Sequence, residues 1–372
     1  MTHMIGPPEQ EAGGILTIDL GALVANWRSL RERVAPAHCA AVVKADAYGC
    51  GIEQVVPALA RAGCATFFVA HLSEARQARA ASAEATIYVL NGLLPGSAPA
   101  YAVANLRPVI GSHAELAEWN AFRASAGWRG AAALHFDTGM SRLGFAVEEA
   151  GAVAASLGTD HGIALVKSHF ACSEEEHPLN AIQARRFAQV RASFPAIAGS
   201  LANSSGIFLG REAHHDLVRP GVALYGANPL PGQPNPMRAV VALHGRIVQT
   251  RALPQGATVG YSATWTAKRP TQLAIVSVGY ADGFLRAASA SDARCGGEAI
   301  VAGARCPLAG RVSMDLIAID VTDLPVAKVG RGDTVTLLGD GISVDDLAAR
   351  AGTIGYEVLT SLGRRYRRVY VS

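Results

Sequence analysis

Residues 41–49 read Ala41-Val42-Val43-Lys44-Ala45-Asp46-Ala47-Tyr48-Gly49. The apolar run that begins at Cys39 predicts a buried strand ending on Lys44, and the polar and glycine residues after it predict a loop. A lysine at such a position loses the water around its charged form, so the pKa of its amine falls. A neutral amine condenses with carbonyl groups, which makes Lys44 a candidate Schiff-base residue. The alternative is an exposed lysine just beyond a strand end, the usual environment of this residue type.

The chain that follows repeats one pattern, a short apolar run and then an amphipathic helix. The candidate strands are Cys39–Lys44, Ala65–Ala70, Thr86–Leu90, Leu106–Ile110, Ala131–Phe136, Ala164–His169, Ser200–Asn203 and Leu217–Val218. The helical patterns between them include Glu53–Ala62, Ser73–Ala83, His113–Ala126, Val147–Leu157 and Asn180–Phe194. This alternation is typical of an α/β fold of the (β/α)8 type, a TIM-like barrel. An open doubly wound sheet is the competing fold, and it is disfavoured because no Gly-x-Gly-x-x-Gly follows the first strand.

The composition changes at residues 228–236, where four of nine residues are proline. Proline cannot continue a helix or a central strand, so this segment predicts a linker. Beyond it, short β runs separated by Gly- and Asp-containing turns predict a smaller, mostly β domain. We therefore expect a disordered tail over residues 1–14, a barrel domain over residues 15–238 and a C-terminal β domain over residues 239–372.

The overall composition excludes several function classes. Of the 372 residues, 50% are hydrophobic, and the net charge of +3 is too small to indicate a nucleic acid or a membrane surface as partner. No apolar stretch is long enough for a membrane helix or a secretory signal. The six cysteines are scattered without Cys-x-x-Cys spacing, which favours a reduced, cytoplasmic protein. We expect no metal site, because His214-His215-Asp216 lacks the helical His-x-x-x-His spacing.

Polar residues follow several of the predicted barrel strands, at the face where barrel enzymes place their chemistry. They are Lys44, Asp137, Arg142, His169, Asn203, Ser204 and Arg219. The segments Ser204-Ser205-Gly206 and Arg219-Pro220-Gly221-Val222 offer hydroxyl and N–H groups to a phosphate, although such residues also form ordinary turns. A reactive lysine beside a phosphate-binding loop points to pyridoxal 5′-phosphate (PLP), which carries an aldehyde and a phosphate.

Five motifs, in this order along the chain, resemble those of the alanine racemase family. They are Val43-Lys44-Ala45-Asp46-Ala47-Tyr48-Gly49, Asp137-Thr138-Gly139-Met140-Ser141-Arg142-Leu143-Gly144, Arg219-Pro220-Gly221-Val222-Ala223-Leu224-Tyr225-Gly226, Val278-Gly279-Tyr280-Ala281-Asp282-Gly283 and Gly310-Arg311-Val312-Ser313-Met314-Asp315. The resemblance extends from about Ile15 to Val369. It implies a homodimeric PLP enzyme that interconverts L-alanine and D-alanine and supplies D-alanine for peptidoglycan.

The resemblance also implies two catalytic bases. Lys44 matches the lysine that carries PLP and is the first base. Tyr261, in Gly260-Tyr261-Ser262, matches the second base, which acts from the opposite subunit. His169 matches the hydrogen-bond partner of that tyrosine, and Arg219 matches the residue that faces the pyridine nitrogen. Because arginine keeps its proton, Arg219 would leave this nitrogen unprotonated and restrain side reactions such as transamination.

The remaining matched residues surround cofactor and substrate. The cofactor-binding set is completed by Tyr48, Arg142, Asn203, Ser204, Gly221, Val222 and Tyr356, most of them phosphate contacts of the family. Arg142 matches a residue near the phenolic oxygen, and Met314 matches a backbone contact to the substrate carboxylate from the second subunit. Tyr280 and Tyr356 match residues that narrow the entrance, which favours a small side chain. We assign Arg142, Met314 and Tyr280 to substrate binding.

The sequence departs from the family pattern at two positions. Many members have a lysine modified to a carbamate where this chain has His135, and that carbamate braces the arginine that matches Arg142. Histidine forms no stable carbamate, so an anion such as chloride, or another residue, would have to substitute. Ser313 stands where some members have cysteine, a mild change.

Three other functions are weighed against an alanine racemase. A racemase for serine or a larger amino acid would share the scaffold. A decarboxylase of basic amino acids would place a glutamate where this chain has Arg219. A non-catalytic PLP-binding protein would resemble the barrel alone and would lack the second domain with Tyr261 and Met314.

Overall fold

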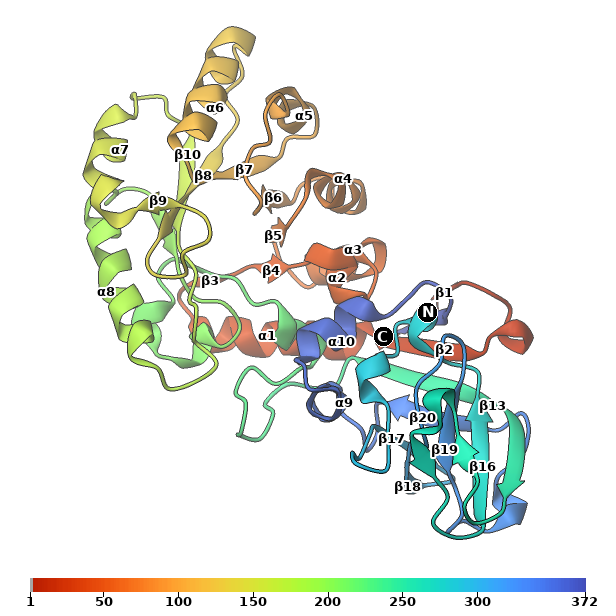
Figure 1. The fold of residues 1–372 in the computed structure, drawn as a ribbon. Coiled ribbons are helices and arrows are strands. Elements are labelled where there is room, and N and C mark those ends of the chain that lie inside the picture. Colours follow the sequence, from red (N-terminus) through yellow and green to blue (C-terminus); the bar gives the residue numbers. More distant parts are fainter. Residues whose placement is uncertain (1–2) are drawn as a thin grey trace.

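The computed structural model describes residues 3–372 and has two domains (Figure 1). The first is a barrel of parallel strands surrounded by helices, and the second is mostly antiparallel β structure. The barrel strands are β3 (His38–Cys39), β4 (Ala41–Val42), β5 (Thr66–Val69), β6 (Thr86–Val89), β7 (Arg107–Ile110), β8 (Ala132–Asp137), β10 (Ile163–Lys167), β11 (Ala198–Ser200) and β12 (Leu217–Val218). A short strand, β9 (Phe145–Ala146), pairs with β8.

The barrel closes where its last strand meets its first. β12 pairs in parallel with β3, and Ala40 N donates to Val218 O at 3.0 Å. β3 and β4 are the two parts of the predicted strand Cys39–Lys44, separated at Ala40. The (β/α)8 class expected from the sequence is confirmed. The first strand nevertheless ends at Val42, and Lys44 already begins α2 (Lys44–Tyr48).

Helices cover the outside of the barrel. They are α1 (Leu20–Val34), α3 (Ile52–Arg61), α4 (Leu72–Ala81), α5 (Ala98–Val103), α6 (His113–Ala126), α7 (Ala150–Ser156) and α8 (Pro178–Ala192). The ends of α6 follow the sequence: Ser112 Oγ accepts from Glu115 N, and Gly127 terminates the helix with a φ of 60°. α5 is absent from our prediction because its six residues, with a proline in the first turn, carry too little helical periodicity.

The second domain is built around the long strand β13, which pairs with β2, β16 and β20. Its elements are β2 (Gly14–Asp19), β13 (Val241–Leu253), β14 (Thr258–Val259), β15 (Trp265–Thr266), β16 (Thr271–Val276), β17 (Glu298–Val301), β18 (Ala304–Pro307), β19 (Ile317–Asp320), β20 (Thr334–Leu338), α9 (Val344–Ala351), α10 (Gly355–Ser361) and β21 (Arg367–Val371). Although β2 precedes the barrel in sequence, it lies between β13 and β21, so the N-terminal segment contributes to the second sheet.

The N-terminal segment differs from our expectation. β1 (His3–Ile5) pairs antiparallel with β21, and residues Glu9–Glu11 form a 3-10 helix. The expected disorder over residues 1–14 is therefore wrong for residues 3–14, whereas residues 1 and 2 lie outside the described residues. Local composition did not indicate this strand, because its hydrogen-bond partner is the last strand of the chain.

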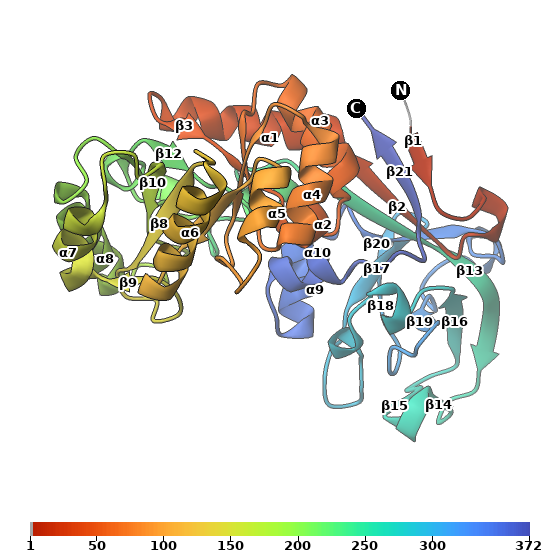
Figure 2. The ribbon, with the colours of Figure 1, turned by 90° about the horizontal axis from the view of Figure 1, so that it is seen from above.

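The two domains share one continuous hydrophobic core. Figure 2 shows α10 between the barrel and the second domain, and the β14–β15 hairpin at the far end from the barrel. All six cysteines are free thiols. Across residues 3–372, every helix is either too short or too polar to cross a membrane.

Candidate active site

Lys44 begins a turn with an unusual backbone. The next four residues, Ala45 to Tyr48, have φ values between 52° and 55°, in the left-handed region. Each non-glycine residue in this region costs about 1–2 kcal/mol relative to a right-handed helix. Strain of this kind persists only where the surrounding structure holds it, and it is often found at functional sites. The turn therefore fixes the direction in which the Lys44 side chain leaves the barrel.

Glu74, near the start of α4, holds this turn in place. One of its carboxylate oxygens accepts from Ala45 N at 2.6 Å. The other accepts from Ala70 N at 2.8 Å and His71 N at 3.1 Å. Our reading of the sequence missed Glu74. Its only sequence signal is its spacing of three residues after His71 at a helix start, the spacing of a capping box.

Lys44 borders a cavity of about 550 Å³ near the carboxyl ends of the barrel strands. The basic residues that line this barrel cavity are Lys44, His71, His135, Arg142, Lys167 and His169. Burial lowers the pKa of the Lys44 amine, Arg142 lowers it further, and Glu74 opposes the shift. The environment therefore favours the neutral amine that carbonyl condensation needs.

The loops after β11 and β12 form a cradle for an anion. Ser204 Oγ accepts from Gly221 N at 2.9 Å and from Ala223 N at 3.3 Å, which joins the two loops. Tyr48 lies directly against Gly221, and a Cβ at position 221 would come within 2.3 Å of its hydroxyl oxygen. Because Gly221 has no side chain, the Tyr48 hydroxyl approaches its backbone next to the Ser204 hydroxyl, and these two hydroxyl groups could bind a phosphate.

Two further predicted residues lie around this cradle. The Tyr48 ring is 6.1 Å from the Tyr356 ring, which α10 brings to the barrel. Burial raises the pKa of Tyr356 to about 12, so its hydroxyl keeps its proton and can donate. The Asn203 side-chain oxygen accepts from Gly206 N at 2.8 Å, so this residue shapes the turn beside Ser204.

Arg219 is buried, and its terminal nitrogens are held by the barrel. They donate to Ser200 Oγ, Ser168 O, Leu201 O and His169 Nδ1, the last at 3.2 Å. A guanidinium group only donates, so His169 Nδ1 accepts and its ring proton lies on Nε2. Burial lowers the pKa of Arg219 to about 9, which leaves it charged at neutral pH. None of these hydrogen bonds involves Arg219 Nε.

Next to this pair, His135 and Lys167 face each other from neighbouring strands. They are in register on β8 and β10, and Lys167 Nζ lies 3.2 Å from His135 Nδ1. Arg142, in the loop after β8, is exposed and makes no hydrogen bond to any residue within 3–372. Our reading of the sequence missed Lys167. Its signal was a lysine inside an apolar strand, two positions before His169.

Three predicted residues lie on the second domain, and none of them lines the barrel cavity that Lys44 borders. Tyr261 is 67% exposed, Met314 is 51% exposed and Tyr280 is 39% exposed. Tyr280 N donates to Ser313 O at 3.0 Å, which places Tyr280 beside Met314. The Ser313 hydroxyl donates to Leu316 O at 2.7 Å and so stabilises this loop. A single chain thus exposes these three groups on its second domain, and we call the exposed part that they occupy the second-domain surface.

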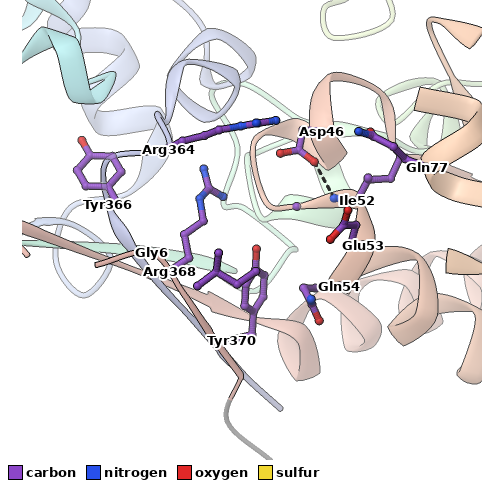
Figure 3. A pocket seen from close by; sticks show the side chains of 12 residues that line it. Gly6, Asp46, Ile52, Glu53, Gln54, Gln77, Arg364, Tyr366, Arg368 and Tyr370 are labelled. Atoms are coloured by element: carbon purple, nitrogen blue, oxygen red, sulfur yellow. Dashed lines mark hydrogen bonds between the residues drawn. The ribbon is translucent and has the colours of Figure 1, made fainter. Parts of the chain in front are cut away.

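A smaller cavity of about 250 Å³ borders the Lys44 turn through Asp46 (Figure 3). Figure 3 shows the Asp46 carboxylate bonded to Ile52 N, with Arg364 and Arg368 nearby. Arg368 donates to Gly49 O and thereby connects β21 to the turn. None of the predicted catalytic residues lines this cavity, so we place the chemistry in the barrel cavity. Among residues 3–372, no group of three or more His, Cys, Asp or Glu is arranged to hold a metal ion.

Sequence comparisons match both domains to one family. The sequence model described as alanine racemase, N-terminal domain, matches residues 18–229, and that described as alanine racemase, C-terminal domain, matches residues 240–370. An alanine racemase of Methylobacterium sp. (strain 4-46) is 56% identical over 96% of this chain and 98% of its own length. A catabolic alanine racemase of Mesorhizobium japonicum is 50% identical over 98% of this chain and 94% of its own length.

Solved structures agree with these matches. The alanine racemase of Bartonella henselae, a structure with covalently bound pyridoxal phosphate, superposes with a TM-score of 0.91 at 39% identity, over 97% of this chain and 100% of that one. The biosynthetic alanine racemase of Pseudomonas aeruginosa superposes with a TM-score of 0.88 at 36% identity, over 97% of this chain and 100% of that one. The chain therefore belongs to the alanine racemase family.

Proposed function

We propose that this protein interconverts L-alanine and D-alanine with PLP as cofactor. The observation that carries the proposal is the juxtaposition of the strained Lys44 turn with the anion cradle, where Tyr48 from the turn contacts Gly221. Membership of the alanine racemase family supports the same activity.

The residues of the barrel fit PLP. The Ser204 hydroxyl and the Tyr48 hydroxyl, which lie against Gly221, suit a phosphate, and Lys44 suits its aldehyde. When bound, PLP supplies a carbonyl group for amine condensation and a conjugated ring that accepts electrons from the substrate α-carbon. Arg219, charged and buried, would donate to the pyridine nitrogen and leave it without a proton of its own. A ring whose nitrogen carries no proton withdraws electrons only weakly from the substrate α-carbon. Return of the α-proton is therefore favoured over transamination.

Racemisation needs a proton acceptor and a proton donor on opposite faces of the α-carbon. Lys44 would serve one face. Tyr261 of the partner subunit would serve the other, with His169 as its hydrogen-bond partner. The second-domain surface supports a homodimer, because Tyr261, Met314 and Tyr280 are exposed in one chain and do not line the barrel cavity that its own Lys44 borders.

We infer that the substrate is small. Tyr356 projects beside the cradle, and the partner's Tyr280 would close the entrance from the other side, which limits the side chain to about the size of a methyl group. The backbone beside Met314 and the guanidinium group of Arg142 would hold the substrate carboxylate. A racemase for serine remains the runner-up, because a hydroxymethyl group is only one atom larger.

The test is D-alanine formation from L-alanine by the purified protein, with and without added PLP. We expect activity in the wild type and a loss of at least about 1,000-fold in Lys44→Ala, because this change removes both the covalent attachment and one base. Lys268→Ala, at an exposed position, is the control and should retain activity. A wild type that binds PLP yet racemises neither alanine nor serine would overturn the proposal.

We further propose that the protein acts in the cytoplasm and supplies D-alanine for peptidoglycan. A catabolic role is the second candidate, because the relative from Mesorhizobium japonicum is named a catabolic alanine racemase. Deletion of the gene distinguishes the two roles. A requirement for D-alanine supports the biosynthetic role, whereas a growth defect only on alanine as carbon source supports the catabolic one.

A further inference from the structure

Lys167 is a buried group that the proposed reaction does not use. Its side chain lies within β10 and is 3% exposed, whereas Lys44 is half-buried and both Lys268 and Lys328 are exposed. Its amine faces the barrel cavity and lies 3.2 Å from His135 Nδ1. A lysine in such a position is rarely left without a specific partner.

The surroundings of Lys167 contain positive charge and no compensating acid. No Asp or Glu lines the barrel cavity. The charged groups that act on Lys167 are Arg219, Arg142 and Lys44. Burial, followed by these cations, lowers the pKa of the Lys167 amine well below its usual value. A protonated Lys167 would add another cation to this cluster, so the surroundings favour the neutral form of the amine.

Arg142 is a second group of this cavity without a specific partner. It borders the same cavity, yet no residue within 3–372 accepts a hydrogen bond from its guanidinium group. An arginine that positions a ligand needs an acceptor to fix it, preferably an anionic one. A neutral amine has no negative charge to offer, but it retains a lone pair and reacts with electrophiles.

We propose that Lys167 is carbamylated by dissolved carbon dioxide and that the carbamate lies between His135 and Arg142. The Nζ lone pair forms a bond to the carbon of CO2, one C=O π pair moves to oxygen, and Nζ releases one proton to water. The product carries one negative charge and two acceptor oxygens. His135, whose Nδ1 faces Nζ, can donate to one oxygen, and Arg142 to the other. This places an anion on β10, in register with the position where the family pattern has its modified lysine and this chain has His135.

In this arrangement Lys167 is a positioning residue that acts through Arg142. The modification itself is independent of the reaction, whereas its effect on turnover rests on the proposed function. The experiment therefore needs a readout of the modification that does not depend on activity.

The first measurement is 13C NMR of the holoenzyme equilibrated with 13C-labelled bicarbonate. We expect a carbamate resonance, separate from free bicarbonate, that disappears in Lys167→Met and persists in Lys268→Met and Lys44→Ala. Acidification should release the label. No resonance in the wild type, or one that survives Lys167→Met, overturns the proposal.

A second measurement uses the wild type alone, so that it stands even if Lys167→Met fails to fold. Methylation of the holoenzyme with a trialkyloxonium reagent converts a carbamate into a stable ester that mass spectrometry can locate. The ester is expected on the peptide that contains Lys167 and not on Lys268 or Lys328. An unmodified Lys167, together with activity that rises with chloride, would assign the site to a bound halide instead and overturn the proposal.

Turnover supplies the third readout. Lys167→Met should reduce kcat/KM for alanine by about tenfold, the worth of one charge-assisted hydrogen bond to Arg142. Label on Lys167 without racemase activity would overturn the proposed function and support the carbamylation of Lys167. Racemase activity without label on Lys167 would support the proposed function and overturn the carbamylation.

Discussion

Single residues decide whether the barrel domain can hold an anion. Gly221 leaves space for the Tyr48 hydroxyl, Ser204 joins the two loops of the cradle, and the buried Arg219 brings a positive charge against His169, which lines the barrel cavity. Each of these roles depends on one chemical property: the absence of a Cβ, a short hydroxyl side chain, or a guanidinium group that keeps its proton at neutral pH.

Gly221→Ala tests the space in the cradle. The new Cβ would meet the Tyr48 hydroxyl oxygen at 2.3 Å, so the loop or the tyrosine must move. We expect the Kd for PLP to rise at least about tenfold, equivalent to 1.4 kcal/mol. Absorbance titration of the apoenzyme with PLP measures it.

Gly151→Ala is the matched control for this change. Gly151 lies in α7, and a Cβ there meets no atom within 4 Å. Its affinity for PLP should equal that of the wild type. Equal affinities in both variants would show that Gly221 does not border the cofactor.

At the scale of elements, the proposed chemistry depends on the contact between the Lys44 turn and the start of α4. The turn is strained at four successive residues, and its own sequence offers no glycine before Gly49 to relieve that strain. The carboxylate of Glu74 offsets this backbone strain, because it accepts hydrogen bonds from three backbone N–H groups at once.

Glu74→Gln tests this compensation. An amide has only one acceptor oxygen, so at least one N–H group among Ala45, Ala70 and His71 loses its partner. We expect the free energy of unfolding to fall by about 1–3 kcal/mol and racemase activity to fall with it. Urea denaturation measures the first effect. Glu84→Gln, at an exposed loop position, should change stability by less than about 0.5 kcal/mol; an equal effect of both changes would argue against the role of Glu74.

At the scale of the whole molecule, the proposed site is divided between two surfaces. The barrel carries Lys44 and the cradle, and the second domain carries Tyr261 at its far end (Figure 2). The exposed aromatic and methionine side chains of the second-domain surface suit burial against a second copy of the chain.

Mixing two inactive variants tests this division. Lys44→Ala and Tyr261→Phe should each be inactive as homodimers. After denaturation and refolding together in equal amounts, the heterodimer has one site with both bases intact, so about a quarter of wild-type activity should return. The racemisation assay measures the recovery. Refolding each variant alone is the control, and a mixture that stays inactive while forming dimers would contradict a shared site.

His169 contributes to the pH dependence of stability. Burial, and then Arg219, lower the pKa of His169 well below its usual 6.5. Between these two pKa values the unfolded chain binds a proton that the folded chain does not, so stability falls as the pH drops below about 6.5. We expect His169→Asn to flatten this dependence, because the unfolded variant has one proton fewer to gain. Thermal unfolding at pH 5 to 8 measures it, and an unchanged slope would contradict the prediction.

The sequence by itself determined the features that depend on neighbouring residues. Buried runs alternating with helical patterns predicted the barrel, the prolines of residues 228–236 predicted a break between domains, and the strand ending near Lys44 predicted the reactive amine. These features could be predicted because periodicity, turn chemistry and the environment of a strand end are local properties. The barrel strands begin and end within three residues of their predicted bounds.

Only the tertiary structure decided which distant segments meet. The pairing of β1 with β21 ordered a segment that its composition marks as a tail. Glu74 reached the Lys44 turn from the next helix, and Lys167 met His135 through the register of two parallel strands. Such contacts depend on how the barrel closes and on which strands become neighbours, and the spacing of residues along the chain does not encode these distances.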